Sequence, residues 1–300
     1  MVALPKTITS LATDGAQIRA IRTRQFPPTL PAAPAHAPST ADRRGIVGRM
    51  RIAGSRIWVT GASSGIGAAL ARELEERGAH VAISARRKEK LDEIADGKMH
   101  VEPLDVTDRE ATVAAGAAIR AHLGGLDVAV LNAGAWDQVG VTRWDSSVFR
   151  QHFDVNLMGT VHCIEAVLPA MLEAEKGMIA GVASVAGYRG LPNSEAYGAT
   201  KAAQINLLES MRIDLRKRGV QVQTICPGFV KTEMTERNTF PMPFIITAEE
   251  AAKRMADGIA KEKAEVVFPL PMMLMMKAAR FVPVAPWAGL LAHAARKPSR

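Results

Sequence analysis

The chain has 300 residues, 48% of them hydrophobic, which is enough for one large α/β domain, and its two cysteines exclude a disulfide framework and indicate a reducing compartment. The net charge of +8 comes from the two ends, because the first 51 residues hold eight basic and two acidic side chains and the last 35 hold five basic and none acidic. The segment between is mildly acidic and has no basic stripe interleaved with aromatics, which excludes a nucleic-acid partner.

Residues 1–50 form a leader that is rich in Pro, Ala, Thr and Arg and poor in acidic residues. Such a segment buries too little apolar surface to offset its ordering entropy, so we predict that it is disordered. It has no hydrophobic region of a secretory signal. It fits an organelle transit peptide, and it fits equally a translated upstream stretch, because Met50 stands directly before the predicted fold. The sequence leaves both alternatives open.

After the leader, short runs rich in Val and Ile alternate with segments of helical periodicity. Predicted strands lie at residues 57–60, 80–84, 100–104, 127–132, 178–184, 221–226 and 265–268. Helix-length segments between strands are typical of β-α-β units, which build a parallel sheet covered on both faces. We therefore predict a doubly wound α/β fold with seven parallel strands in one domain (51–268), followed by a Pro/Met-rich basic tail (269–300).

The first predicted strand runs directly into a glycine-rich loop and then into a helix. Gly61 permits a tight turn, Gly65 lets the backbone approach a pyrophosphate, and Gly67 lets helix and strand pack closely. The helix N-terminus supplies free N–H groups and a positive dipole end. This placement predicts a dinucleotide site. Its candidate loop residues are Gly61, Ser63, Ser64, Gly65, Ile66 and Gly67.

The second predicted strand ends in Ser84-Ala85-Arg86-Arg87-Lys88, which contains no carboxylate. A protein that binds NAD usually has Asp or Glu at this point to hold the ribose hydroxyls. A carboxylate would repel the 2′-phosphate of NADP, whereas an arginine can bind it by two charge-assisted hydrogen bonds. The sequence therefore predicts NADP(H), with Arg86 as the first candidate ligand and Arg87 as the second. An ordinary solvated basic loop is the alternative.

Three polar side chains indicate an acid/base site. Tyr197 and Lys201 are four residues apart, so they share one face of a helix. An ammonium beside a phenol favours the phenolate, so we expect Lys201 to lower the tyrosine pKa toward neutrality, as a general acid/base requires. Ser184 ends a predicted strand, where its hydroxyl can reach a substrate oxygen. Each feature alone has a structural explanation; a fourth candidate, Asn156, could be a turn or capping residue.

The order of these motifs is more specific than any one of them. The glycine loop, Asn132-Ala133-Gly134, Asn156, Ser184, Tyr197-x-x-x-Lys201 and Pro227-Gly228 follow one another at the ends of successive strands. Over roughly residues 53–268, the sequence thus resembles the short-chain dehydrogenase/reductase family, which has the Rossmann fold. The resemblance implies that Tyr197 is the acid/base, that Ser184 orients the substrate oxygen, that Lys201 binds the nicotinamide ribose, and that Asn156 holds a relay water.

The resemblance also implies the activity and the remaining cofactor contacts. These contacts would be Asp105, Val106, Asn132, Ala133, Gly134, Pro227, Gly228 and Thr232, with Tyr197 and Lys201 at the nicotinamide end. The implied reaction is a hydride transfer between nicotinamide C4 and a carbonyl or secondary alcohol, in a cytoplasmic homodimer or homotetramer. A cofactor-binding membrane-docked scaffold, and isomerase or dehydratase chemistry on the same fold, remain alternatives. The seven histidines show no metal-ligand spacing, so no metal is expected.

The apolar run Phe240-Pro241-Met242-Pro243-Phe244 favours an apolar substrate. The Pro/Met-rich tail loosely resembles that of family relatives that act on lipid-like or steroid-like alcohols and ketones, which implies a substrate of that class. The tail has two interpretations. It could be a helix packed on the core or on a partner subunit. It could also be a positively flanked amphipathic segment that touches anionic lipid, or that lines a substrate entrance.

Overall fold

The structure, a computed structural model, describes residues 50–238 and 240–295 of the chain. The predicted disorder of the leader falls on residues 1–49 and so lies outside the described residues. Every element named below belongs to one compact unit that begins at Val47.

Seven parallel strands form one sheet in the order β3-β2-β1-β4-β5-β6-β7. The strands are β1 (Arg56–Thr60), β2 (His80–Ser84), β3 (His100–Val101), β4 (Val128–Leu131), β5 (Gly177–Val182), β6 (Val220–Pro227) and β7 (Glu265–Phe268). The order reverses direction at β1 and β4, which is the arrangement of a doubly wound sheet. The predicted seven-stranded parallel fold is therefore confirmed.

The third strand is shorter than predicted, because β3 ends at Val101 rather than at residue 104. Pro103 has no N–H group and cannot donate to a ladder. The backbone still follows β2, since Glu102 N donates to Ile83 O at 3.0 Å and Leu104 N donates to Ala85 O at 2.9 Å. The other strand ends differ from the prediction by no more than two residues.

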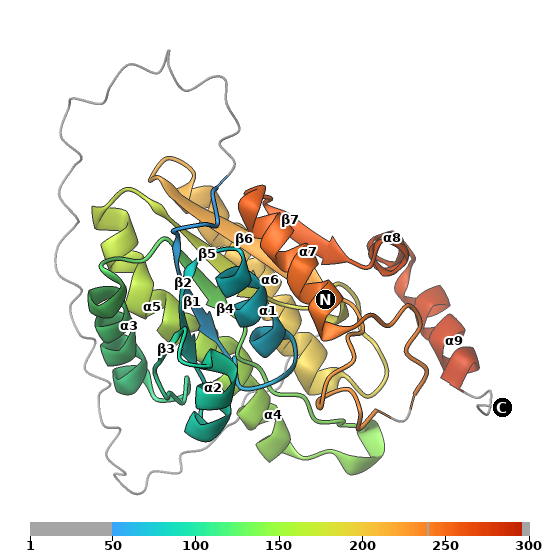
Figure 1. Cartoon of the computed structure of the whole chain (residues 1–300). Helices are drawn as coiled ribbons and strands as arrows, with labels where there is room; N and C mark the ends of the chain where they lie inside the picture. Colours follow the sequence, from blue (N-terminus) through green and yellow to red (C-terminus); the bar gives the residue numbers. More distant parts are fainter. Residues whose placement is uncertain (1–49, 239, 296–300) are drawn as a thin grey trace, which may run out of the picture. The chain divides into compact units, whose positions relative to one another are not determined.

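Helices cover both faces of the sheet (Figure 1). One face packs against α1 (Gly65–Glu76), α2 (Lys88–Ala95) and α7 (Ala248–Ala260), and the other against α3 (Arg109–Leu123), α5 (Gly159–Glu173) and α6 (Glu195–Leu215). Successive strand residues point to opposite faces, so Ile57 and Val59 enter the first core and Trp58 the second. This explains why the strands read as continuous apolar runs rather than as alternating ones.

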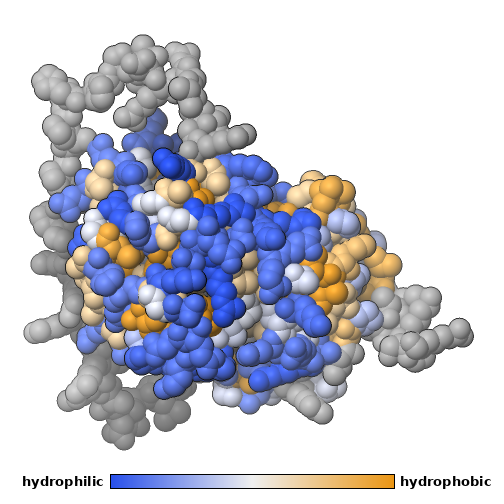
Figure 2. All heavy atoms as spheres, in the orientation of Figure 1, coloured by the Kyte–Doolittle hydropathy of each residue, from blue (hydrophilic) through white to orange (hydrophobic). Residues whose placement is uncertain are grey.

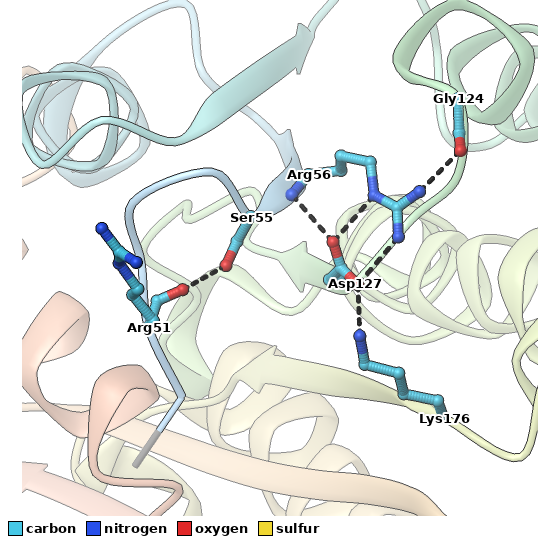
Figure 3. Close-up of polar contacts among 6 residues, drawn as sticks. All are labelled: Arg51, Ser55, Arg56, Gly124, Asp127 and Lys176. Atoms are coloured by element: carbon cyan, nitrogen blue, oxygen red, sulfur yellow. Dashed lines mark hydrogen bonds and ion pairs between the residues drawn. The ribbon is translucent and has the colours of Figure 1, made fainter.

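A polar cluster joins the strands at their amino ends (Figure 3). Asp127, directly before β4, accepts hydrogen bonds from Arg56 Nε at 2.8 Å and Nη2 at 3.0 Å, and from Lys176 Nζ at 3.1 Å. The Arg56 guanidinium, as the largest cause, holds the pKa of the Asp127 carboxyl well below its usual range. The cluster connects β1, β4 and β5 at the amino ends of the strands. The predicted site residues lie at the opposite, carboxyl ends.

One long helical stretch changes from α-helical to π-helical geometry in its middle and back again. It runs through α4 (Ser146–His152), a π-helical turn η2 (Phe153–Met158) and α5. Its 28 residues are long and apolar enough to cross a membrane by length and composition, the only such helix among the described residues, and 44% of its most apolar window is buried inside the domain. A core helix of this fold passes the same test.

The tail forms two helices, α8 (Leu270–Ala279) and α9 (Val284–Ala295). Met272 and Met276 of α8 are buried against Tyr188 and Cys226. The prediction of a helix packed on the core thus holds for one side of α8. Much of the remaining tail surface is apolar and exposed.

Candidate active site

The predicted site residues meet at the carboxyl ends of the central strands, around a cavity of about 340 Å³. Each of the expected cofactor contacts lines this cavity, although they come from distant parts of the sequence. They are Gly61, Ser63, Ser64, Gly65, Ile66, Gly67, Arg86, Asp105, Val106, Asn132, Ala133, Gly134, Tyr197, Lys201, Pro227, Gly228 and Thr232. Ser184 lines it as well, whereas Asn156 lies fully buried behind the wall.

Two glycines of the loop, Gly61 and Gly67, leave no room for a Cβ atom. Gly61 and Gly65 have φ of +67° and +55°, a region that L side chains rarely adopt. A Cβ on Gly67 would lie 2.3 Å from the Gly61 carbonyl oxygen and 2.5 Å from Asn132 Nδ2. Asn132 Nδ2 donates to the carbonyl oxygens of Thr60 and Gly61, at 3.0 and 3.2 Å. Asn132 therefore fixes the backbone at the start of the glycine loop through these two hydrogen bonds.

The start of α1 is suited to an anion. Ser64 occupies the N-cap position without a side-chain capping bond, and no acidic residue lies in the first turn. The first N–H groups of α1 are thus not satisfied by a cap, and the positive end of the helix dipole is not neutralised. This end of the cavity can bind a phosphate.

Both arginines after β2 line the cavity, in different ways. Arg87 Nη2 donates to the hydroxyls of Ser63 and Ser64, each at 3.1 Å, and its Nη1 lies 3.7 Å from a Glu233 carboxylate oxygen. Arg86 forms no ion pair with any residue in 50–238 or 240–295. Arg87 thus connects the end of β2 to the glycine loop.

Tyr197 and Lys201 lie one turn apart on α6, with Lys201 Nζ 5.4 Å from the centroid of the tyrosine ring. The Lys201 ammonium donates to the carbonyl oxygen of Val182 at 3.0 Å, and the residue is only 3% exposed. Ser184 lies after β5, where its hydroxyl accepts a hydrogen bond from Ala186 N at 3.1 Å. The same hydroxyl donates to the carbonyl oxygen of Pro227 at 3.5 Å, and Ser184 and Tyr197 both line the cavity.

The expected lowering of the Tyr197 pKa is wrong for the chain by itself. Burial raises the pKa of Tyr197 to about 12, although the nearby Ser184 hydroxyl acts in the opposite direction. Burial also lowers the pKa of Lys201 to about 8. The physical reason is that both groups leave water together, and that the ammonium bonds to a backbone carbonyl rather than to the phenol oxygen.

Asn156 sits in the π-helical turn and is fully engaged with the protein. Its Nδ2 donates to Ala135 O at 3.1 Å and to Thr200 Oγ1 at 3.0 Å, and its Oδ1 accepts from Ala135 N at 2.7 Å. Its backbone carbonyl accepts from Gln204 Nε2 at 2.8 Å. Asn156 therefore joins α6 to the loop after β4 and fixes the turn on which Tyr197 and Lys201 depend.

Sequence reasoning missed an aromatic neighbour of the tyrosine. Trp136 packs edge-on against Tyr197, with ring centroids 5.0 Å apart, and its indole Nε1 donates to Asn238 Oδ1 at 2.9 Å. A tryptophan within a loop, directly after Ala135, is a signal that could have been noticed, because large aromatic side chains seldom remain without packing partners. Nothing in the sequence marks Asn238, which is 102 residues away.

No metal site is formed by the described residues, among which no three His, Cys, Asp or Glu side chains are grouped to hold an ion. Two histidines have structural partners. His152 Nε2 accepts a hydrogen bond from Asp137 N at 3.0 Å, and His100 stacks on His122 with ring centroids 3.9 Å apart.

Comparison with known proteins identifies the family and supports the fold. A family model described as short chain dehydrogenase matches residues 55–241. An uncharacterised oxidoreductase of Myxococcus xanthus (strain DK1622) is 42% identical over 231 residues, which cover 75% of this chain and 91% of that protein. A solved short chain dehydrogenase from Burkholderia cenocepacia J2315 in complex with NADP has a TM-score of 0.72 at 28% identity, covering 81% of this chain and 99% of that one. A structure described as ribose-5-phosphate isomerase from Brucella melitensis 16M has a TM-score of 0.68 at 30% identity, with 73% and 91% covered.

Proposed function

The chain belongs to the short-chain dehydrogenase family, and on this premise we propose that it is an NADP(H)-dependent oxidoreductase acting on a carbonyl or secondary alcohol. The proposal rests on one arrangement, in which Ser184, Tyr197 and Lys201 together line the wall of a cavity whose other end is the glycine loop. A nicotinamide cofactor, when bound, supplies or accepts the hydride. The residues of this chain bind, orient and move the proton.

Proton transfer is the task of Tyr197. With a pKa raised to about 12, its phenol is protonated at neutral pH and can donate to a carbonyl oxygen as negative charge develops there. Ser184, next to the phenol, donates a second hydrogen bond to that oxygen. This state of the tyrosine favours reduction of a carbonyl over oxidation of an alcohol.

The chain has only two tyrosines, which provides a matched test. We expect Tyr197→Phe to abolish carbonyl-dependent NADPH consumption while NADPH affinity changes little. Tyr188→Phe removes a hydroxyl that donates to Glu265, outside the cavity, and should retain turnover. Activity retained in Tyr197→Phe would contradict the assigned role.

The preference for NADP(H) is proposed from the two arginines. Arg87 donates to the serine hydroxyls of the glycine loop, whereas Arg86 lines the cavity without an ion-pair partner among the described residues. We therefore expect Arg86 to bind the 2′-phosphate, with Arg87 beside it. Loss of one bidentate charged contact should weaken NADPH by about tenfold to a hundredfold. In titrations of nucleotide binding, Arg86→Ala should weaken NADPH far more than NADH, whereas Lys88→Ala should affect neither.

An equal loss for both nucleotides in Arg86→Ala would refute that assignment. A selective loss in Arg87→Ala alone would transfer the role to Arg87.

Isomerisation is a second candidate, because one similar structure is described as an isomerase. It would consume a hydroxy-carbonyl substrate with no net change in nicotinamide absorbance. We favour oxidoreduction because Ser184, Tyr197 and Lys201 are assembled around the cavity. A panel of apolar ketones and alcohols, followed both by absorbance of the reduced nicotinamide and by chromatography of the products, distinguishes the two reactions. The same panel tests the proposed apolar substrate.

We further propose that the folded oxidoreductase begins near Met50 and that the leader is dispensable for folding. Ile52 is buried in the core, and Ser55 Oγ donates to Arg51 O, so the first of the described residues already pack into the domain. Expression from Met50 should preserve the thermal transition and cofactor affinity. Loss of either would place part of residues 1–49 in the domain.

A further inference from the structure

The tail leaves a large apolar surface exposed on helices that are otherwise anchored. We call this surface the tail face; it consists of Leu270, Leu274, Met275, Phe281, Val284 and Leu290. Phe281 is 89% exposed and Val284 is 74% exposed. Figure 2 shows the corresponding hydrophobic area over α8 and α9, beside a mostly hydrophilic remainder of that side of the molecule. Contiguous exposed apolar surface of this kind usually marks an interaction site.

The composition of α9 indicates which kind of partner could cover this helix. Residues 281–295 contain no Asp, Glu, Lys or Arg. A helix that is apolar all round is normally buried, in protein or in lipid. With 12 residues, α9 is too short to span a bilayer and could only lie along its surface.

The charge of the tail distinguishes between two partners that could cover the tail face, a lipid surface and a second copy of the chain. Residues 266–300 have basic residues before and after α9 in the sequence and no acidic ones, the basic residues being Lys277, Arg280, Arg296, Lys297 and Arg300. Glu265 neutralises Lys277 through an ion pair, so the positive charge of this segment comes from the other four. A symmetric dimer through this face would bring two such positive sets together. Anionic lipid headgroups would be attracted by the same charges. We propose that the tail face docks the protein onto anionic membrane surfaces.

Two hydrogen bonds connect the tail to the loop that follows Ser184. Arg189 Nη2 donates to Val282 O at 2.8 Å, and Trp287 Nε1 donates to Gly190 O at 2.9 Å. Docking would therefore hold this loop, which borders the active site, next to the bilayer. If the proposed oxidoreductase function is correct, its apolar substrate reaches the cavity from the membrane; the docking itself requires no turnover.

Flotation of the full chain with vesicles tests the proposal. Binding is expected to phosphatidylcholine vesicles that contain phosphatidylglycerol, and not to vesicles of phosphatidylcholine alone. The double variant Phe281→Ser and Val284→Ser should lower the bound fraction by more than about tenfold, because two exposed anchors lose their apolar contact with lipid. Ile213→Ser on α6, where the isoleucine is 76% exposed, is the matched control and should bind as the parent does.

Thermal transitions verify that the variants are folded, and light scattering follows their oligomeric state. Absence of parent binding, binding that is equal without anionic lipid, or binding unchanged in the double variant would each overturn the proposal. A double variant that dissociates an oligomer without changing vesicle binding would assign the tail face to a second copy instead. Tyr197→Phe should bind vesicles normally, so failure of the catalytic assignment is distinguishable from failure of docking.

Discussion

Replacing Lys201 with methionine should make the protein more stable while it removes activity. The folded pKa of Lys201 is lowered from 10.5 to about 8 by burial. At neutral pH the folded protein therefore keeps a proton on an amine that burial makes less basic. A shift of this size corresponds to a cost of about 3 kcal/mol. Methionine has a similar length and no charge, so its substitution removes that cost.

One hydrogen bond opposes this gain. Lys201 Nζ donates to the carbonyl oxygen of Val182, which methionine would leave without that donor, at a cost of about 1 kcal/mol. The net expectation is that Lys201→Met raises the free energy of unfolding by about 2 kcal/mol at pH 7. Turnover should be lost, because the amine beside Tyr197 is absent.

The stability difference between the parent and Lys201→Met depends on pH. Below about pH 8 the lysine is protonated in both states, so the cost to the folded state is full and constant. Between about 8 and 10.5 the unfolded chain holds the proton and the folded chain does not, so the parent's stability rises with pH. The advantage of Lys201→Met should therefore shrink as the pH rises through this window.

Urea unfolding of parent and variant at pH 7, 8, 9 and 10 measures this difference, and other titrations cancel in the comparison. Lys217→Met, at an exposed lysine, should show no such pH-dependent advantage. A variant that is less stable than the parent at pH 7, or a difference that stays flat with pH, would refute the claim that Lys201 is held in a desolvating site.

Three further changes probe the loop, the strand cluster and the aromatic neighbour. Gly67→Ala places a Cβ 2.3 Å from the Gly61 carbonyl oxygen, so calorimetry should detect cofactor affinity at least about tenfold weaker. Asp127→Asn should lose about 2 kcal/mol in urea at pH 7, because the charged contacts with Arg56 disappear. Since the Asp127 pKa is lowered in the folded state, this loss should begin to shrink as the pH falls below about 4, and it should disappear only as the pH approaches the much lower folded pKa. Trp136→Ala should reduce kcat/KM at unchanged NADPH affinity; unchanged kinetics would mean that the ring edge does not support Tyr197.

Local features allowed much of the fold to be predicted. Apolar runs of strand length separated by helix-length segments identify a parallel sheet, because only helices can cover both of its faces. The glycine loop is equally local, since the φ of +67° at Gly61 and the close approach at Gly67 require the absence of a Cβ. Tyr197 and Lys201 are one turn apart on a single helix, so their neighbourhood follows from helical geometry.

Contacts between distant segments, and the electrostatics that depend on them, were decided by the tertiary structure alone. Asn238 reaches Trp136 across 102 residues, and no periodicity encodes that meeting. Lys201 was expected to lower the pKa of Tyr197, whereas burial raises it to about 12. A sequence states which groups are charged and how far apart they lie along one helix. How much water remains around them depends on what the other strands and loops bring over that helix, and desolvation outweighs the pairing of neighbours.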